Sequence, residues 1–246
     1  MLKEKASMNP YNAFTQIALM MVLITTAGWT QVHTAEQILD SLQAHFGAIQ
    51  DYSVDVDVVI QMEKGRIPPM RVTVYYKKPD KWHYQSNGFA FLPKDAVMIA
   101  PERFRKLMSG AKLQGIEQVE NHLAYHLVLH LQEKRSSHNA KIHLWVDKSR
   151  WVILKIRTES PEMGYMELNI EHHLVENRFW LPKKTVVQIH FEPIADNLAG
   201  SSIADSIKTR HSPMRQIFRH GVAYVTFYNY KVNQGLPDEL FQGKKK

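Results

Sequence analysis

The stretch that decides the fold covers residues 141–191 and reads KIHLWVDKSRWVILKIRTESPEMGYMELNIEHHLVENRFWLPKKTVVQIHF. Within it, apolar residues recur at every second position in four successive runs. Short turn-forming segments separate the runs at residues 147–150, 160–164 and 175–178. Alternation interrupted in this way is typical of antiparallel strands with one apolar and one polar face. We therefore predict a four-stranded meander, and its apolar face must be covered by something.

The same alternation recurs on both sides of this meander. It is clearest at residues 52–62, and it predicts further strands at residues 70–76, 82–84, 115–131 and 222–232. An interrupted apolar signal predicts one or two short strands at 89–99, followed by one or two helical turns at 101–107. Residues 192–221 lack periodicity and predict an exposed loop.

One strongly amphipathic helix is predicted, ahead of the first strand. Ile38, Leu42 and Phe46 recur at helical spacing and form its apolar stripe. Thr34 is followed three residues later by Gln37, which is the spacing of a capping box. The helix is therefore expected to begin just after Thr34.

The N-terminal residues 1–34 have the features of a signal peptide. Lys3 and Lys5 precede an apolar run at 17–27 that is short for a membrane span but fits a signal-peptide core. Small residues suited to cleavage fall between positions 27 and 35, and an uncleaved anchor is the alternative. We expect an exported periplasmic protein whose single folded domain covers residues 35–246.

Composition excludes several function classes. The chain of 246 residues contains no cysteine, so disulfides, thiolate nucleophiles and cysteine metal sites are ruled out. Its net charge of +7 is scattered, and no basic cluster is interleaved with aromatic residues. Nucleic-acid binding is therefore not expected, whereas a basic protein suits anionic membrane surfaces.

The count of nine or ten strands against one good helix predicts a mainly β (α+β) fold, built on a curved antiparallel sheet. Its apolar concave face can be filled by its own side chains, by a covering helix or by a ligand. A helix of about sixteen residues is roughly 24 Å long and cannot cover the whole face. Exposed apolar surface is costly at ~25 cal/mol per Å². A hydrophobic ligand is therefore one of the open hypotheses.

Two groups of residues could suggest metal or acid–base chemistry. His122, His126 and His130 have a spacing that would bind zinc from a helix. The residues between them indicate a strand, which spreads the three over about 27 Å. Asp55 and Asp57 share one strand face, which is expected to be solvated. We predict no catalytic residues, no metal and no cofactor, and no hydrolase motif is present.

Short motifs in a particular order resemble a known family. They are YKKPDKW at 76–82, WVD at 145–147, FWLPK at 179–183 and YNYKVNQGLP at 228–237. With the preceding helix and strand, they resemble the LolA/LolB-like superfamily of outer-membrane lipoprotein-sorting proteins, over residues 35–241. The chain is identified as a divergent member, because Lys78 stands where the sorting carriers have arginine, and lysine lacks the planar fork of arginine.

The resemblance implies an unclosed β-barrel in which the N-terminal helix and short lid helices cover an apolar cavity for acyl chains. It implies a monomeric, non-enzymatic periplasmic carrier of lipid or lipoprotein acyl chains towards the outer membrane. Its partners would be an inner-membrane transporter and an outer-membrane acceptor. The alternative is an RseB-like sensor, in which ligand occupancy regulates a membrane partner.

The apolar strand faces supply the candidate cavity lining, and closed core packing is the alternative reading of the same residues. Lys78 is the candidate lid contact. The candidate acyl-chain residues are Val54, Val56, Val58, Met62, Met70, Val72, Val74, Trp82, Tyr84, Met166, Leu168 and Tyr224.

Overall fold

The computed structural model describes residues 33–62, 67–86, 101–131, 141–160, 164–190 and 220–242, without the side chains of Arg103 and Ser160. The chain divides after His33, and the elements described below belong to the unit Thr34–Lys246. Nearly all of the expected signal peptide, the short strands expected at 89–99 and most of the loop expected at 192–221 lie outside the described residues.

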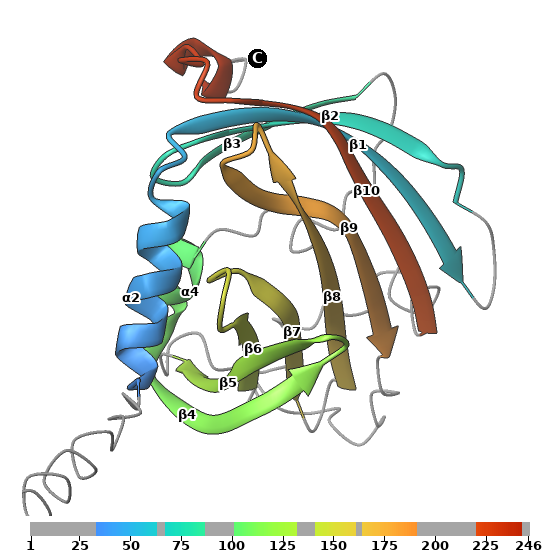
Figure 1. The fold of residues 1–246 in the computed structure, drawn as a ribbon. Helices are drawn as coiled ribbons and strands as arrows, with labels where there is room; N and C mark the ends of the chain where they lie inside the picture. Colours follow the sequence, from blue (N-terminus) through green and yellow to red (C-terminus); the bar gives the residue numbers. More distant parts are fainter. Residues whose placement is uncertain are drawn as a thin grey trace, which may run out of the picture. The chain divides into compact units, whose positions relative to one another are not determined.

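Ten antiparallel strands form the sheet. They are β1 (Asp51–Met62), β2 (Met70–Lys77), β3 (Lys81–Ser86), β4 (Met108–Val119), β5 (His122–Leu131), β6 (Lys141–Asp147), β7 (Ile153–Ser160), β8 (Gly164–Val175), β9 (Phe179–His190) and β10 (His220–Val232). Their order is β3-β2-β1-β10-β9-β8-β7-β6-β5-β4. The sheet curls strongly, with β3 and β4 as its edges (Figure 1). The predicted mainly β fold with a curved, unclosed sheet is confirmed.

The predicted meander is present as β6 to β9, and each strand pairs with the next. Local chemistry fixes its turns. Asp147 accepts hydrogen bonds from the backbone N–H groups of Ser149 (2.7 Å) and Arg150 (2.9 Å). Glu176 and Asn177 turn the chain between β8 and β9 with φ of 51° and 50°. The period of two and the turn residues therefore act together to set the register.

One prediction in the sheet was wrong. Residues 115–131 were expected as one strand, but they contain a turn at Glu120, whose φ is 50°. The chain before this turn forms the edge strand β4, which pairs with β5. The register shifts near Gly110 and Gly115, so β4 lacks clean alternation. That irregularity concealed β4 in the sequence.

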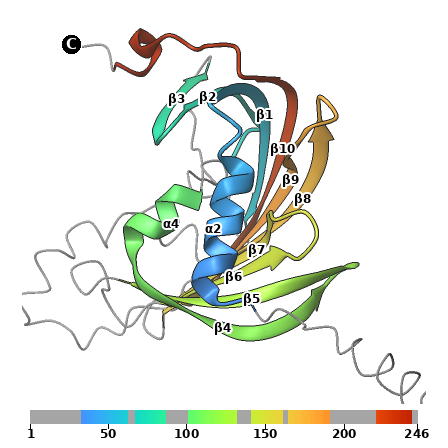
Figure 2. The ribbon, with the colours of Figure 1, turned by 60° about the vertical axis from the view of Figure 1, so that its left-hand side comes forward.

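The described helices are α2 (Ala35–Phe46), α4 (Pro101–Leu107) and the 3-10 helix η4 (Asp238–Phe241). The predicted capping box is confirmed. Gln37 N donates to Thr34 Oγ1 at 3.2 Å, and Thr34 N donates to Gln37 Oε1 at 2.9 Å. Figure 2 shows α2 and α4 side by side on the concave side of the sheet. Among the described helices, none combines the length and apolarity needed to cross a bilayer.

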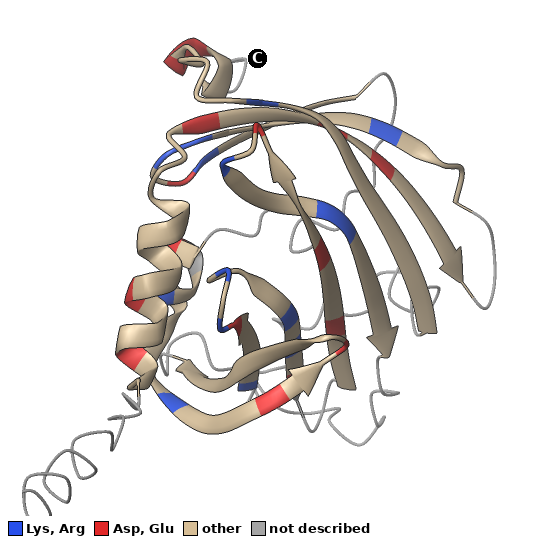
Figure 3. Cartoon of the chain, viewed as in Figure 1, with Lys and Arg blue, Asp and Glu red and all other residues tan. Residues whose placement is uncertain are grey.

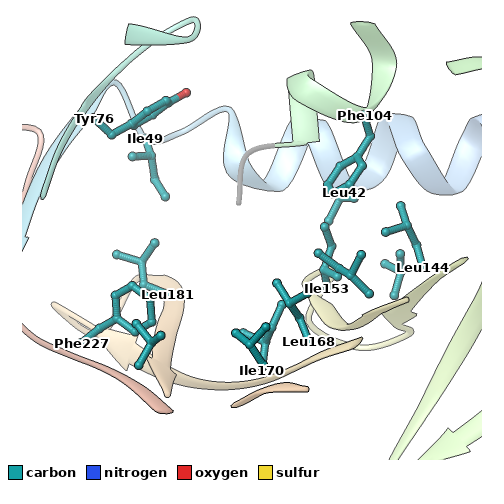
Figure 4. Packing of buried hydrophobic residues seen from close by; sticks show 14 of the residues in the cluster. Leu42, Ile49, Tyr76, Phe104, Leu144, Ile153, Leu168, Ile170, Leu181 and Phe227 are labelled. Carbon is teal, nitrogen blue, oxygen red and sulfur yellow. The ribbon is translucent and has the colours of Figure 1, made fainter. Parts of the chain in front are cut away.

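The main core lies between α2 and the concave face of the sheet. Ile38, Leu39 and Leu42 are the buried stripe of α2. Figure 4 shows Leu42 and Phe104, from the two helices, directed toward residues of the strands below them. Because these helices share one core with strands from the whole sheet, they are structural parts of the fold as well as its cover.

The loop between α2 and β1 is fastened to the end of β10. Asp51 is buried, and its carboxylate accepts hydrogen bonds from the N–H groups of Gln234 (2.8 Å) and Gly235 (3.0 Å). Gln50 N donates to Asn233 Oδ1 at 2.7 Å. Gly235 has a φ of 74°, which glycine adopts without strain. This set of contacts fixes the C-terminal end of α2 relative to the sheet.

Replacing Asp51 with alanine should lower the free energy of unfolding by about 1–3 kcal/mol, because it removes the buried carboxylate that accepts two part-buried hydrogen bonds. Urea denaturation would measure the change. Glu171→Ala is the matched control, since Glu171 pairs with Lys183 at an exposed site. That variant should change stability by less than about 1 kcal/mol. Equal losses in the two variants would contradict the role given to Asp51.

Candidate functional site

A cavity of about 310 Å³ lies between the C-terminal half of α2 and the turns that join β6 to β7 and β8 to β9. This volume is within the range of small-ligand pockets. Its polar lining side chains are His45, His172 and Arg178. The other lining residues are Leu42, Ala44, Phe46, Ala48, Ile49, Pro101, Trp151, Val152, Ile153, Phe179, Trp180, Leu181 and Pro182.

The wall formed by the β6–β7 turn is held rigidly. Arg150 donates from Nε to Asp147 Oδ2 at 2.8 Å, and its guanidinium lies 5.1 Å from the centre of the Trp180 ring on β9. Burial alone would raise the pKa of Asp147, but hydrogen bonds from Arg150 and Ser149 outweigh it and lower the pKa. The carboxylate therefore stays ionised and holds Arg150 against Trp180, while the Asp147 backbone carbonyl accepts a hydrogen bond from Trp151 N at 3.1 Å.

The opposite wall is the end of α2, which is anchored to the β2–β3 turn. Lys78, the expected lid contact, donates from Nζ to the Gly47 carbonyl at 3.0 Å. Its backbone N–H also donates to the Gln50 carbonyl at 2.8 Å. A cation is favourable at this position, because the last carbonyls of a helix carry partial negative charge.

Toward its other end, α2 is held by α4. Arg105 forms an ion pair with Asp40, and the buried Phe104 belongs to the same core as Leu42. The Asp40 side chain is 70% exposed, so this ion pair contributes little to stability. The polar contacts described for α2 are thus strongest at its C-terminal end, and the rest of the helix is held mainly by the core packing of Ile38, Leu39 and Leu42.

The twelve residues expected to line an acyl site lie outside this cavity. Six are fully buried in the core, and Met62, Met70, Trp82 and Met166 pack against that core. Tyr84 lies on the edge strand β3 and is 41% exposed. Tyr224 lies on the convex face, where Lys184 Nζ is 5.6 Å from the ring centre. The six core residues are Val54, Val56, Val58, Val72, Val74 and Leu168.

Sequence reasoning missed the residues that do line the cavity. They come from the end of α2, the start of α4, the β6–β7 and β8–β9 turns and nearby positions of β7, β8 and β9. No single alternating strand face contains them, so the period of two does not group them. The usable signal was the pair Trp151 and Trp180, each close to a turn and within two residues of an arginine. Large aromatic residues beside turns are candidates for pocket walls.

The histidines at the cavity are uncharged at neutral pH. Burial lowers the pKa of His172 to about 3, and the positive charge of Arg150 acts in the same direction. Burial also lowers the pKa of His45. Arg178 is therefore the cation of the described lining, and no acidic residue belongs to that lining.

The other residues singled out in the sequence have ordinary partners on the convex face. His126 lies 2.7 Å from Glu117 and 2.9 Å from the ring nitrogen of His143. Asp57 pairs with Arg71 at 2.8 Å, and Asp55 accepts from Thr73 at 2.9 Å. Within the described ranges, no group of three or more metal-ligating side chains could hold an ion.

Lys78→Met should loosen the C-terminal turn of α2 because it removes the hydrogen bond to the Gly47 carbonyl. We expect faster amide exchange in residues 43–46 and a loss of about 1 kcal/mol in stability. Hydrogen–deuterium exchange followed by mass spectrometry would measure the first effect. Lys183→Met, at an exposed ion pair, is the control. Unchanged exchange in Lys78→Met would show that this contact does not hold the helix.

The pKa of His172 predicts a dependence of stability on pH. The unfolded chain takes up a proton near pH 6.5, whereas folded His172 does so only near pH 3. The free energy of unfolding should therefore fall as pH drops below about 6.5, by about 2 kcal/mol between roughly pH 7.5 and pH 5.

Urea denaturation at the two pH values would measure this contribution of His172. In His172→Gln the loss should be smaller by that amount, and His130→Gln, at an exposed position, should behave like the unmodified protein. A His172→Gln variant with the full pH dependence would contradict the assignment.

No protein-family model and no curated protein matches the sequence. Solved structures that share the fold include these three. A LolA superfamily protein from Nitrosomonas europaea has a TM-score of 0.57 and 14% identity, over 85% of this chain and 98% of its own. A DUF1329 family protein from Desulfovibrio piger has a TM-score of 0.57 and 12% identity, and the match covers 86% of this chain and 98% of that protein's chain. A putative outer membrane lipoprotein-sorting protein domain from Vibrio parahaemolyticus has a TM-score of 0.52 and 12% identity, and the match covers 85% of this chain and 97% of that domain's chain.

Proposed function

From the LolA-like fold of this chain, we propose that the protein is a non-enzymatic carrier of lipid or lipoprotein acyl chains. It shields these chains from water in its half-barrel during transfer towards the outer membrane. The observation that carries this proposal is the largely apolar cavity of about 310 Å³ beneath α2. A cavity lined in this way binds its ligand mainly by removing apolar surface from water.

The cavity is the preformed part of a larger acyl site in this proposal. Movement of α2 away from the sheet would uncover the inner faces of β1, β2 and β8, which carry nine of the twelve residues expected from the sequence. Met62, Met70 and Met166 already pack at the margin of that core. Methionine repacks readily against ligands of different shape. Acyl chains that enter the cavity would extend along these faces once the helix has moved.

The proposed place of action is the periplasm. This follows from the signal-peptide features of residues 1–34, with their apolar run at 17–27. There the protein, acting as a monomer, would receive its ligand from an inner-membrane transporter and deliver it to an outer-membrane acceptor. Release requires α2 to move, or an acceptor that binds the acyl chains more tightly.

Ala44→Trp should weaken the binding of a fluorescent acyl probe at least about tenfold, because the indole would occupy the cavity. Ala44 lines the cavity from an exposed position on α2, so the core need not change. Gln43→Trp is the matched control, since Gln43 is the preceding residue of the same helix and is not part of the lining. Fluorescence titration would measure both affinities.

Native mass spectrometry of the protein purified from its own periplasm would identify a bound lipid. A protein that carries no lipid and fails to bind the acyl probe would refute the carrier proposal. Equal probe affinities in the two tryptophan variants would show that ligands bind elsewhere. Co-purification with a membrane regulator in place of lipid would favour the ligand-sensing alternative.

A further inference from the structure

The cavity has one permanent positive charge, on Arg178, and no acidic residue in its described lining. We infer that it selects an acyl chain with an anionic headgroup, and that Arg178 binds this headgroup at the rim. The inference rests on the proposed function, and it adds the class of ligand. The inference distinguishes two classes of ligand, an anionic single-chain lipid and an uncharged acyl group, and assigns the first to this cavity.

The β8–β9 turn fixes the position of this arginine. Glu176 and Asn177 have positive φ, and Arg178 N donates to the Val175 carbonyl at 3.0 Å. The Arg178 guanidinium lies 5.1 Å from the centre of the Phe179 ring. Phe179 is itself buried and lines the cavity. The charge is therefore held directly against the apolar wall, with the side chain exposed at its outer end.

Arg178 differs from the other arginines whose side chains are described. Arg71, Arg105, Arg150 and Arg157 each form an ion pair with a carboxylate. Figure 3 shows acidic and basic residues interspersed over the strands, which makes such pairing easy. In the described part of the chain, Arg178 has no carboxylate partner. Its fork of N–H donors is thus available to an oxyanion.

The remaining polar lining agrees with an anionic headgroup. His45 and His172 are neutral at pH 7, so neither attracts a cationic headgroup, and Arg178 would repel one. The apolar walls would contribute the same to the binding of an uncharged chain, but such a chain would gain nothing from Arg178. A carboxylate and a phosphate monoester are two sources of the same charge, and both match the guanidinium fork.

The test is displacement of a bound fluorescent acyl probe from the full chain by dodecanoate, by dodecyl phosphate and by uncharged dodecanol. Arg178→Gln should weaken the binding of at least one anionic ligand about fivefold, which is the upper range for one exposed ion pair. Its affinity for dodecanol should not change. The fivefold effect should shrink in high salt, because salt screens exposed charges.

Lys184→Gln is the control for a general loss of positive charge. Lys184 lies on the convex face beside Tyr224 and does not line the cavity. That variant should bind all three ligands like the unmodified protein. The anion whose affinity depends more strongly on Arg178 identifies the headgroup as carboxylate or phosphate.

Two results would overturn the inference. In the first, Arg178→Gln weakens dodecanol and the anions equally, which would mean that the variant has damaged the cavity. In the second, the anions bind to Arg178→Gln as to the unmodified protein. Either result leaves the carrier proposal intact as long as dodecanol displaces the probe. If the probe does not bind to the unmodified protein, the carrier proposal and this inference fail together.

Discussion

The structure depends on the covering of one apolar face, the concave side of a sheet that does not close. Ten strands spaced about 4.8 Å apart extend for about 43 Å from one edge strand to the other, measured along the curve of the sheet. The twelve residues of α2 make a helix about 18 Å long. One such helix can bury the middle of the concave face but not its full width. The cavity at the C-terminal end of α2 is a part of this face that the described helices and their neighbours leave unfilled.

The attachment of α2 is uneven, and this unevenness links the fold to its proposed use. At the C-terminal end, hydrogen bonds hold the helix and the α2–β1 loop. Lys78 donates to the Gly47 carbonyl, and hydrogen bonds to Asn233 and Asp51 fasten the loop to the end of β10. Toward the other end, the polar tie is the exposed ion pair of Asp40 with Arg105. Motion of α2 would therefore pivot about the anchored end. In the proposed carrier, the walls of the cavity next to the pivot would keep their geometry while the rest of the core opens.

Sequence reasoning recovered the parts of this structure that depend on local patterns. The meander followed from a period of two, and the start of α2 followed from Thr34 and Gln37. The edge strand β4 escaped detection because shifts near Gly110 and Gly115 break its alternation. The cavity could not be located, because alternation shows which face of a strand is apolar but not how far a helix covers it. Trp151, Arg178 and Trp180 lie in or beside turns, where that pattern gives no information.

The chemistry of the rim bears on which ligands the fold can carry. The apolar walls distinguish poorly among acyl chains, because burial of apolar surface has no directional preference. Discrimination must then come from the few polar groups, and among these only Arg178 keeps a full charge at neutral pH. Its position is set by the turn at Glu176 and Asn177, and not by the strands that form the walls. A change in this turn would therefore alter headgroup preference while leaving the sheet, the cover and the cavity as they are.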